Sequence, residues 1–206
     1  WGKNVIINAT DSEFVSVDTS TAENYSAIAL NNNGTNSAEN TVITVTGGSI
    51  TALDENGAPS IAIRNATATG VANVSNTTVV TGEIREVVAI VTYNGYDAFY
   101  SHFTLQDSIN RAANDPNATV KLLKNITISE KLVIEGNVVI DGNDKTITYT
   151  GTDRAIDVPN TANGANVTIK NLTVTTTGER AINVIQNATN VTIENVTATA
   201  NNYTVN

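Results

Sequence analysis

Two stretches of the sequence decide the fold: Asn166-Val167-Thr168-Ile169-Lys170-Asn171-Leu172-Thr173-Val174-Thr175 and its near copy Asn190-Val191-Thr192-Ile193-Glu194-Asn195-Val196-Thr197-Ala198-Thr199. In both, apolar side chains alternate with threonine, which is the period of a strand with one buried face. A related segment starts at Asn137, and Arg154–Val158 recurs one repeat later as Arg180–Val184. Three short strands per repeat, without a connecting helix, predict a parallel β-helix whose equivalent strands stack in register.

The corners of the repeats carry residues that suit a sharp turn. Asn171 and Asn195 fall at the same place between the first two strands, and Gly142 occupies the matching place in the preceding repeat. Asparagine and glycine are the residues that most readily adopt a left-handed backbone. We therefore predict a structural corner at these positions, with the asparagine amides of successive repeats hydrogen-bonded to one another.

The N-terminal part has the same character with longer repeats. Units begin at Asn4, Asn40 and Asn73, and Ser26–Leu30 and Ser60–Arg64 supply the third strand. The predicted domains are β-helix repeats of about 33–36 residues over 1–83, a capping segment over 84–117, and β-helix repeats of about 24–29 residues over 118–206.

The middle segment interrupts the repeats. Val87–Tyr93 and Tyr96–Tyr100 predict two strands joined by a hairpin at Asn94-Gly95, a strong short-range hairpin signal. An amphipathic helix follows, which Asp115-Pro116 ends. The residues predicted to begin this helix and to cover the end of the repeats are Thr104, Leu105, Asp107 and Ile109.

A family resemblance extends over residues 86 to 200. The hairpin, LQDSINRAAN (105–114), TVKLLKNITISEKLVI (119–134) and VVIDGNDKTIT (138–148) resemble the opening of the pectate-lyase-like right-handed β-helix repeats of large microbial surface and adhesin proteins. The resemblance implies a right-handed helix whose N-terminal end is capped by a strand and a short α-helix. That family includes polysaccharide lyases and hydrolases as well as inert stalks, so the resemblance bears on fold more than on activity.

Composition excludes several functions. The net charge is −9 and the pI is ≈ 4.4, so neither nucleic acid nor an anionic membrane surface is an expected partner. No apolar run is long enough to predict a membrane-inserted helix. Cysteine is absent and His102 is the only histidine, which excludes thiolate chemistry and multi-histidine metal sites.

Candidate sites for chemistry are few. We predict no catalytic residue and no metal site, and we expect His102 to be a surface or capping residue. We expect no cofactor, with calcium as the alternative, for which Asp141, Asn143 and Asp144 are weak candidates. The preferred interpretation of these three residues is a polar corner. Arg154 and Arg180 occupy equivalent positions, each after an acidic residue, which favours a solvated, locally paired row over a site for an acidic sugar.

Asparagine and threonine suggest two surface features. The chain has 14 N-x-S/T sequons, and the glycosylation candidates, if the host glycosylates, include Asn8, Asn65, Asn117, Asn166, Asn190 and Asn202. Strands written N-V-T-I also produce sequons by accident. Outward threonine pairs at 146/148, 173/175 and 197/199 predict a ladder across three repeats, which is either an ordinary exposed strand face or, less favoured, an ice-binding array.

These features lead to an expected function. We expect a non-catalytic structural or adhesive β-solenoid module of a microbial cell-surface protein, located outside the cell. The sequence starts at Trp1 and both ends fall within repeats, which is expected of a window of a tandem array or of a head-to-tail polymer. The expected partners are therefore other copies or neighbouring repeats stacked end to end, and cell-wall or host glycans. The alternative is a polysaccharide-active lyase or hydrolase of the pectate-lyase-like class.

Overall fold

The computed structural model describes residues 3–18, 26–31, 38–67, 69–93, 96–102, 104–113, 115–185 and 190–206, with backbone alone for 96–102. The predicted hairpin turn at Asn94-Gly95 lies outside the described residues. The protein is mainly β, as predicted, and it divides into two compact units, residues 1–87 (unit 1) and 88–206 (unit 2).

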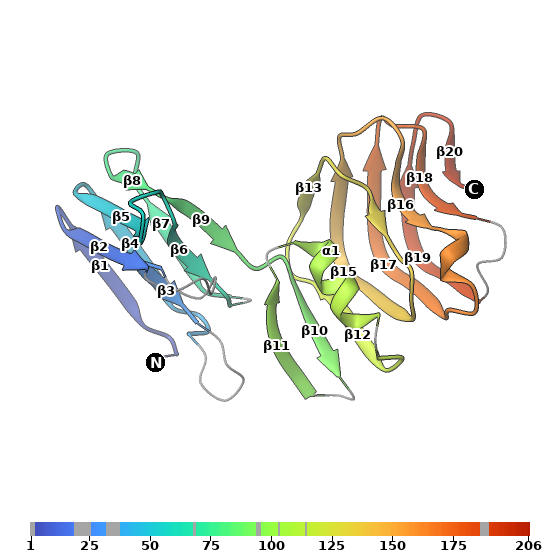
Figure 1. Ribbon diagram of the computed structural model, residues 1–206, viewed down its shortest axis with the longest axis horizontal. Coiled ribbons are helices and arrows are strands. Elements are labelled where there is room, and N and C mark those ends of the chain that lie inside the picture. The colour runs from blue at the N-terminus through green and yellow to red at the C-terminus, as the bar shows by residue number, and fades with distance from the viewer. Residues whose placement is uncertain are drawn as a thin grey trace. The chain divides into compact units, whose positions relative to one another are not determined.

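Unit 1 consists of short strands in which every third strand belongs to the same sheet (Figure 1). Its described strands are β1 (Ile6–Thr10), β2 (Glu13–Asp18), β3 (Ile28–Leu30), β4 (Val42–Thr46), β5 (Ser49–Asp54), β6 (Ile61–Asn65), β7 (Val71–Val74), β8 (Val79–Thr81) and β9 (Glu83–Glu86). They form three parallel sheets with the orders β1-β4-β7, β2-β5-β8 and β3-β6-β9. Val45, Ile50 and Ile63, from the middle strand of each sheet, are buried together in its core.

The third repeat of unit 1 begins earlier than predicted. Asn73 was expected to start it, but Asn73 lies inside β7 and pairs with Thr44. The register follows the core side chains, because Val74 lies opposite the buried Val45. The exposed Asn73 therefore occupies an outward position, where asparagine gives no information about the start of a strand.

Unit 2 begins with an antiparallel hairpin and a helix and continues with parallel strands (Figure 1). Its described elements are β10 (Ala89–Tyr93), β11 (Tyr96–His102), α1 (Leu105–Ala112), β12 (Ala118–Leu122), β13 (Ile126–Ile128), β14 (Leu132–Val133), β15 (Val138–Tyr149), β16 (Arg154–Val158), the 3₁₀ helix η1 (Asn160–Ala162), β17 (Val167–Thr176), β18 (Arg180–Val184), β19 (Val191–Thr199) and β20 (Tyr203–Val205). One sheet has the order β11-β10-β12-β15-β17-β19, with β13 also paired to β15, and the other has the order β14-β16-β18-β20.

The helix α1 lies where the sequence predicted it. The Thr104 hydroxyl accepts the backbone N–H of Asp107 at 3.1 Å, which satisfies one of the free donors of the first turn. Leu105 and Ile109 are buried on one face and belong to the core of unit 2. The Gln106 side chain ties the helix to β14, because its amide both donates to and accepts from the Val133 backbone at 2.8 Å.

The strands β15, β17 and β19 pair in the register that the repeats predict. Ile140, Ile169 and Ile193 lie opposite one another, and Thr173 lies between Thr146 and Thr197. Ile169 is fully buried, as expected for an inward position. Ile193 was expected to be inward too, but it is 36% exposed. β19 is the last described strand of its sheet, so no strand covers Ile193 on the side away from β17.

The corners agree with the prediction at two of three positions. Asn171 and Asn195 have φ of 51° and 50°, but the φ of Gly142 is not positive. The preceding corner is longer, and Asn143 and Asp144 adopt the left-handed backbone instead. Glycine is required at 142 for another reason: a Cβ there would lie 2.5 Å from the Asn171 carbonyl oxygen.

Candidate functional site

The calcium candidates form a polar corner in which the oxygens of Asp141 already have partners. One oxygen of Asp141 accepts the Asn143 backbone N–H at 2.9 Å and the Asn171 amide at 3.2 Å, and the other lies 3.9 Å from Lys170 Nζ. The Asn143 amide donates to the Leu122 carbonyl, and Asp144 is exposed. Within the described residues no group of three or more histidine or acidic side chains is placed to hold a metal ion. Asp141 and Asn143 thus join successive repeats, while the Asp144 side chain lies at the surface.

A denser charged cluster lies at the β14–β16 side of unit 2. Arg154 contacts Asp153 at 2.8 Å and the buried Asp157 at 3.4 Å, and Lys131 lies 3.5 and 3.7 Å from the same carboxylates. The hydrogen bond from Arg154 holds the pKa of Asp153 below its ordinary value and raises the pKa of Arg154 in return. Each acid of this cluster therefore lies between the same two cations, Arg154 and Lys131.

The row that begins at Arg154 continues along the sheet as Arg180 and then Tyr203. Arg180 pairs with Glu179 at 3.0 Å, and its guanidinium lies 5.7 Å from the centre of the Tyr203 ring. Both arginines thus have an acidic neighbour in contact. An acidic sugar would have to compete with these local pairs for either guanidinium.

Sequence reasoning missed an amide column, a column of hydrogen-bonded Asp and Asn side chains, one from each repeat, along the sheet β14-β16-β18-β20. The buried Asp157 accepts the Asn183 amide at 2.8 Å, and Asn183 in turn accepts the Asn206 amide at 2.9 Å. A similar column joins Asn137, Asn166 and Asn190. The recurrence of Asn or Asp at equivalent positions of successive repeats was the signal available in the sequence.

The sequon asparagines fall into two classes. Asn65 is buried and its amide donates to the Gly70 carbonyl at 2.7 Å, while Asn166 and Asn190 are held in the amide column. Asn166 and Asn190 are nevertheless exposed, as are the other three glycosylation candidates: Asn8, Asn117 and Asn202. Among the six candidates, Asn65 is the one whose amide is buried and bonded inside the protein.

The threonine ladder is present on the outer face of β15, β17 and β19. Thr148, Thr175 and Thr199 pair in register, and Thr127 of β13 extends this row by one strand. The row is free of charge and lies beside the parallel row through Thr173. Its hydroxyl-bearing residues repeat from strand to strand.

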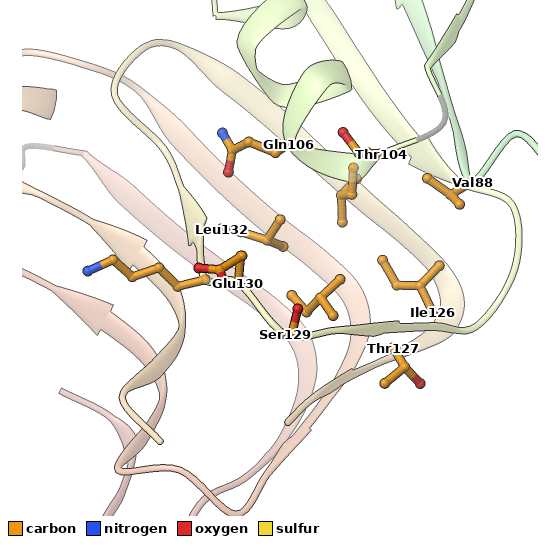
Figure 2. Close-up of a pocket in the computed structure, with 11 residues that line it drawn as sticks. Val88, Thr104, Gln106, Ile126, Thr127, Ser129, Glu130 and Leu132 are labelled. Carbon is orange, nitrogen blue, oxygen red and sulfur yellow. The ribbon is translucent and has the colours of Figure 1, made fainter. Parts of the chain in front are cut away.

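A pocket of about 390 Å³ lies under the first turn of α1 (Figure 2). Figure 2 shows Val88, Ile126 and Leu132 among its lining residues, with Thr104 on the helix side and Glu130 beside Leu132. Its described lining is mostly apolar, and Gln106 is already bonded to Val133. Glu130 and Lys131 are the charged residues of its lining, and Lys131 also lies 3.5 Å from Asp153.

His102 is in β11, where its backbone pairs with Ala89; its side chain lies outside the described residues. No helix among the described residues has the length and apolar character needed to cross a membrane. Comparison of the chain with protein-family models, with curated proteins and with solved structures found no match.

Proposed function

We propose that both units are right-handed parallel β-helices and that the protein is a non-catalytic structural or adhesive module of a microbial cell-surface protein. The observation that carries this proposal is the pairing of equivalent strands of successive repeats, in parallel and in register, in both units. A sheet that takes every third strand is what a helical coil of three strands produces. Such coils give a stiff rod from short strands and small core residues, as a stalk or spacer requires.

The helix α1 supports the proposal through its place in the core. In a β-helix the terminal coil exposes both apolar side chains and unpaired strand edges, so an end that is not stacked on another coil needs a cover. The buried side chains of α1 lie in the same cluster as those of β12 and β15. We assign the hairpin and α1 as the cap of the repeats that start at β12.

The surface chemistry supports a passive role. Asp141 and Asp157 are each bonded to an asparagine of the next repeat, and each lies near a cation. The threonine rows offer a neutral, regular surface on which a glycan chain could lie, with hydroxyls as donors and acceptors. Contact with cell-wall or host glycans, and stacking against other copies, are the interactions we propose outside the cell.

A turnover assay separates this role from a polysaccharide lyase or hydrolase. The full chain is incubated with uronic-acid polysaccharides and calcium, and unsaturated products and reducing ends are measured. The proposal predicts neither. Turnover that is lost in Asp141→Ala and kept in Glu194→Ala, an exposed acid on the next strand but one, would refute it.

A further inference from the structure

We propose that β19 of one copy takes up the first strand of a second copy, so that the chain assembles head to tail; this rests on the proposed β-helix function. The rear edge is defined as Asn190–Ile193, at the start of β19, and the front edge as Asn4–Ile7, at the start of β1. Among the described residues, β19 pairs only with β17 in its sheet and β1 only with β4. Each edge therefore presents one unpaired line of parallel backbone donors and acceptors.

Both edges expose side chains of the kind that the inner repeats bury. Ile193 is 36% exposed although Ile169, its counterpart one repeat earlier, is fully buried. At the front edge Ile7 is 45% exposed and Val5 is exposed as well. Addition of one strand to each edge would bury these side chains as the inner repeats already do.

The two edges match in sequence and in backbone. The front edge reads Asn4-Val5-Ile6-Ile7 and the rear edge reads Asn190-Val191-Thr192-Ile193. Asn4 and Asn190 both adopt the left-handed backbone, with φ of 60° and 57°. When the asparagines are aligned, Val5 lies over Val191 and Ile7 over Ile193, which repeats the pairing of β17 with β19.

The amide columns give this contact a direction. In both units the later asparagine donates to the earlier one: Asn190 Nδ2 to Asn166 Oδ1 at 3.0 Å, and Asn40 Nδ2 to Asn4 Oδ1 at 3.1 Å. Among the described residues this leaves the Asn190 oxygen and the Asn4 Nδ2 group without a partner. A donor at the front edge therefore faces an acceptor at the rear edge, whereas two rear edges would place oxygen against oxygen. This polarity favours a head-to-tail contact over a symmetric one.

The backbone extends the same pattern. The Val138 N–H donates to the Asn166 carbonyl and the Val167 N–H to the Asn190 carbonyl, each at 3.1 Å. The next bond in the series runs from Val191 N–H to the Asn4 carbonyl of the second copy. The proposed strand pairing ends at Ile7 and Ile193, because the next left-handed corner does not come at the same place in the two strands. More residues separate Asn4 from its corner, Asp11, than separate Asn190 from Asn195.

A hollow at the front edge has room for the incoming side chains. It has a volume of about 270 Å³, and its lining includes Val5, Ile7, Leu30 and Ile43. The lining is mainly apolar, which suits the side chains of Val191 and Ile193. Neither edge contains a charged residue, so their pairing brings no like charges together.

The first test is sedimentation velocity over a range of concentrations. The unmodified chain is expected to form species that grow with concentration. Ile193→Lys and Ile7→Lys each place a charge in one edge, and each variant alone is expected to be monomeric. Thr168→Lys, an outward position on the covered strand β17, is the matched control and should assemble like the unmodified chain.

The second test mixes the two blocked variants. Each retains one competent edge of opposite kind, so the mixture is expected to give a 1:1 dimer that does not grow further. That result also shows that both variants are folded. Two results would overturn the proposal: an unmodified chain that is monomeric at every concentration, or blocked variants that still self-associate. These two results bear on assembly alone and leave the proposed function standing. Polysaccharide turnover would refute the proposed function and leave the assembly standing.

Discussion

Replacement of Ile109 by alanine tests whether α1 is an integral cover of unit 2. Ile109 is 1% exposed and lies in the same buried cluster as Leu105 and Ala112 of its helix and Val120 of β12. The substitution removes three carbon atoms from a fully buried site, which loses their transfer free energy and leaves a cavity. Substitutions of this kind cost about 2–5 kcal/mol, and we expect about 3 kcal/mol here.

The assay is urea unfolding followed by far-ultraviolet circular dichroism. With a slope of about 2 kcal/mol per molar urea, a loss of about 3 kcal/mol lowers the midpoint of the unit 2 transition by about 1.5 M. Arg111→Ala, an exposed change on the same helix, is the control and should cost about 0.5 kcal/mol or less. Equal, small losses in Ile109→Ala and Arg111→Ala would refute the assignment of α1 as a packed cap.

Three further predictions concern the faces of the strands, an ion pair and glycosylation. Val174→Ala should destabilise the protein by about 1–3 kcal/mol, because Val174 is fully buried, while Thr173→Lys should change stability by less than about 0.5 kcal/mol; equal sensitivity in denaturant unfolding would contradict the register. The pKa of Asp153 is lowered, so its ion pair stabilises the protein above the ordinary aspartate pKa, and this stabilisation is lost as pH falls through the lowered pKa. The urea midpoint of the unmodified chain should therefore exceed that of Asp153→Asn at neutral pH, and the two midpoints should converge in acid. A difference that grows in acid would contradict this prediction. In a host that glycosylates N-x-S/T sequons, peptide mapping by mass spectrometry should find a glycan at Asn202 and none at Asn65, whose amide is bonded inside the protein, and the reverse pattern would be inconsistent with the fold.

The sequence predicts most about the repeats that keep one length. The spacing between Asn166 and Asn190 predicts the pairing of β17 with β19 residue by residue, because side chains of a strand alternate strictly between two faces. The corner asparagines are predictable for a similar reason. The corner between the first two strands of a repeat requires a left-handed residue, and Asn171 and Asn195 adopt that backbone there.

The sequence fails where a repeat changes length. The corner at Gly142 contains extra residues, so alignment by position assigns the left-handed backbone to the glycine rather than to Asn143 and Asp144. In unit 1 the same problem places the third repeat at Asn73, although the core valines set an earlier start. The exposure of Ile193 depends on what covers the last strand, which no periodicity within the repeat encodes.

The candidate site was predictable only in part. The polar corner at Asp141 follows from the types of residue present. The column of Asp157, Asn183 and Asn206 requires knowledge that three strands stack, because its members are separated by a full repeat in sequence. Long-range contacts of this kind appear only when the register is known.

The central claim, that successive repeats stack in parallel and in register, is tested most directly by a pair of introduced cysteines. The chain has no cysteine, so any disulfide in the variant Thr175→Cys/Thr199→Cys must join the two new residues. These residues face each other across β17 and β19, and neighbouring strands lie about 4.8 Å apart, within the range that a disulfide spans. In the control Thr175→Cys/Thr197→Cys the second cysteine is out of register along β19, beyond the distance of about 7 Å at which a disulfide can form. The account predicts a rapid intramolecular disulfide under mild oxidation in the first variant and none in the second, and preferential formation in the second would contradict it.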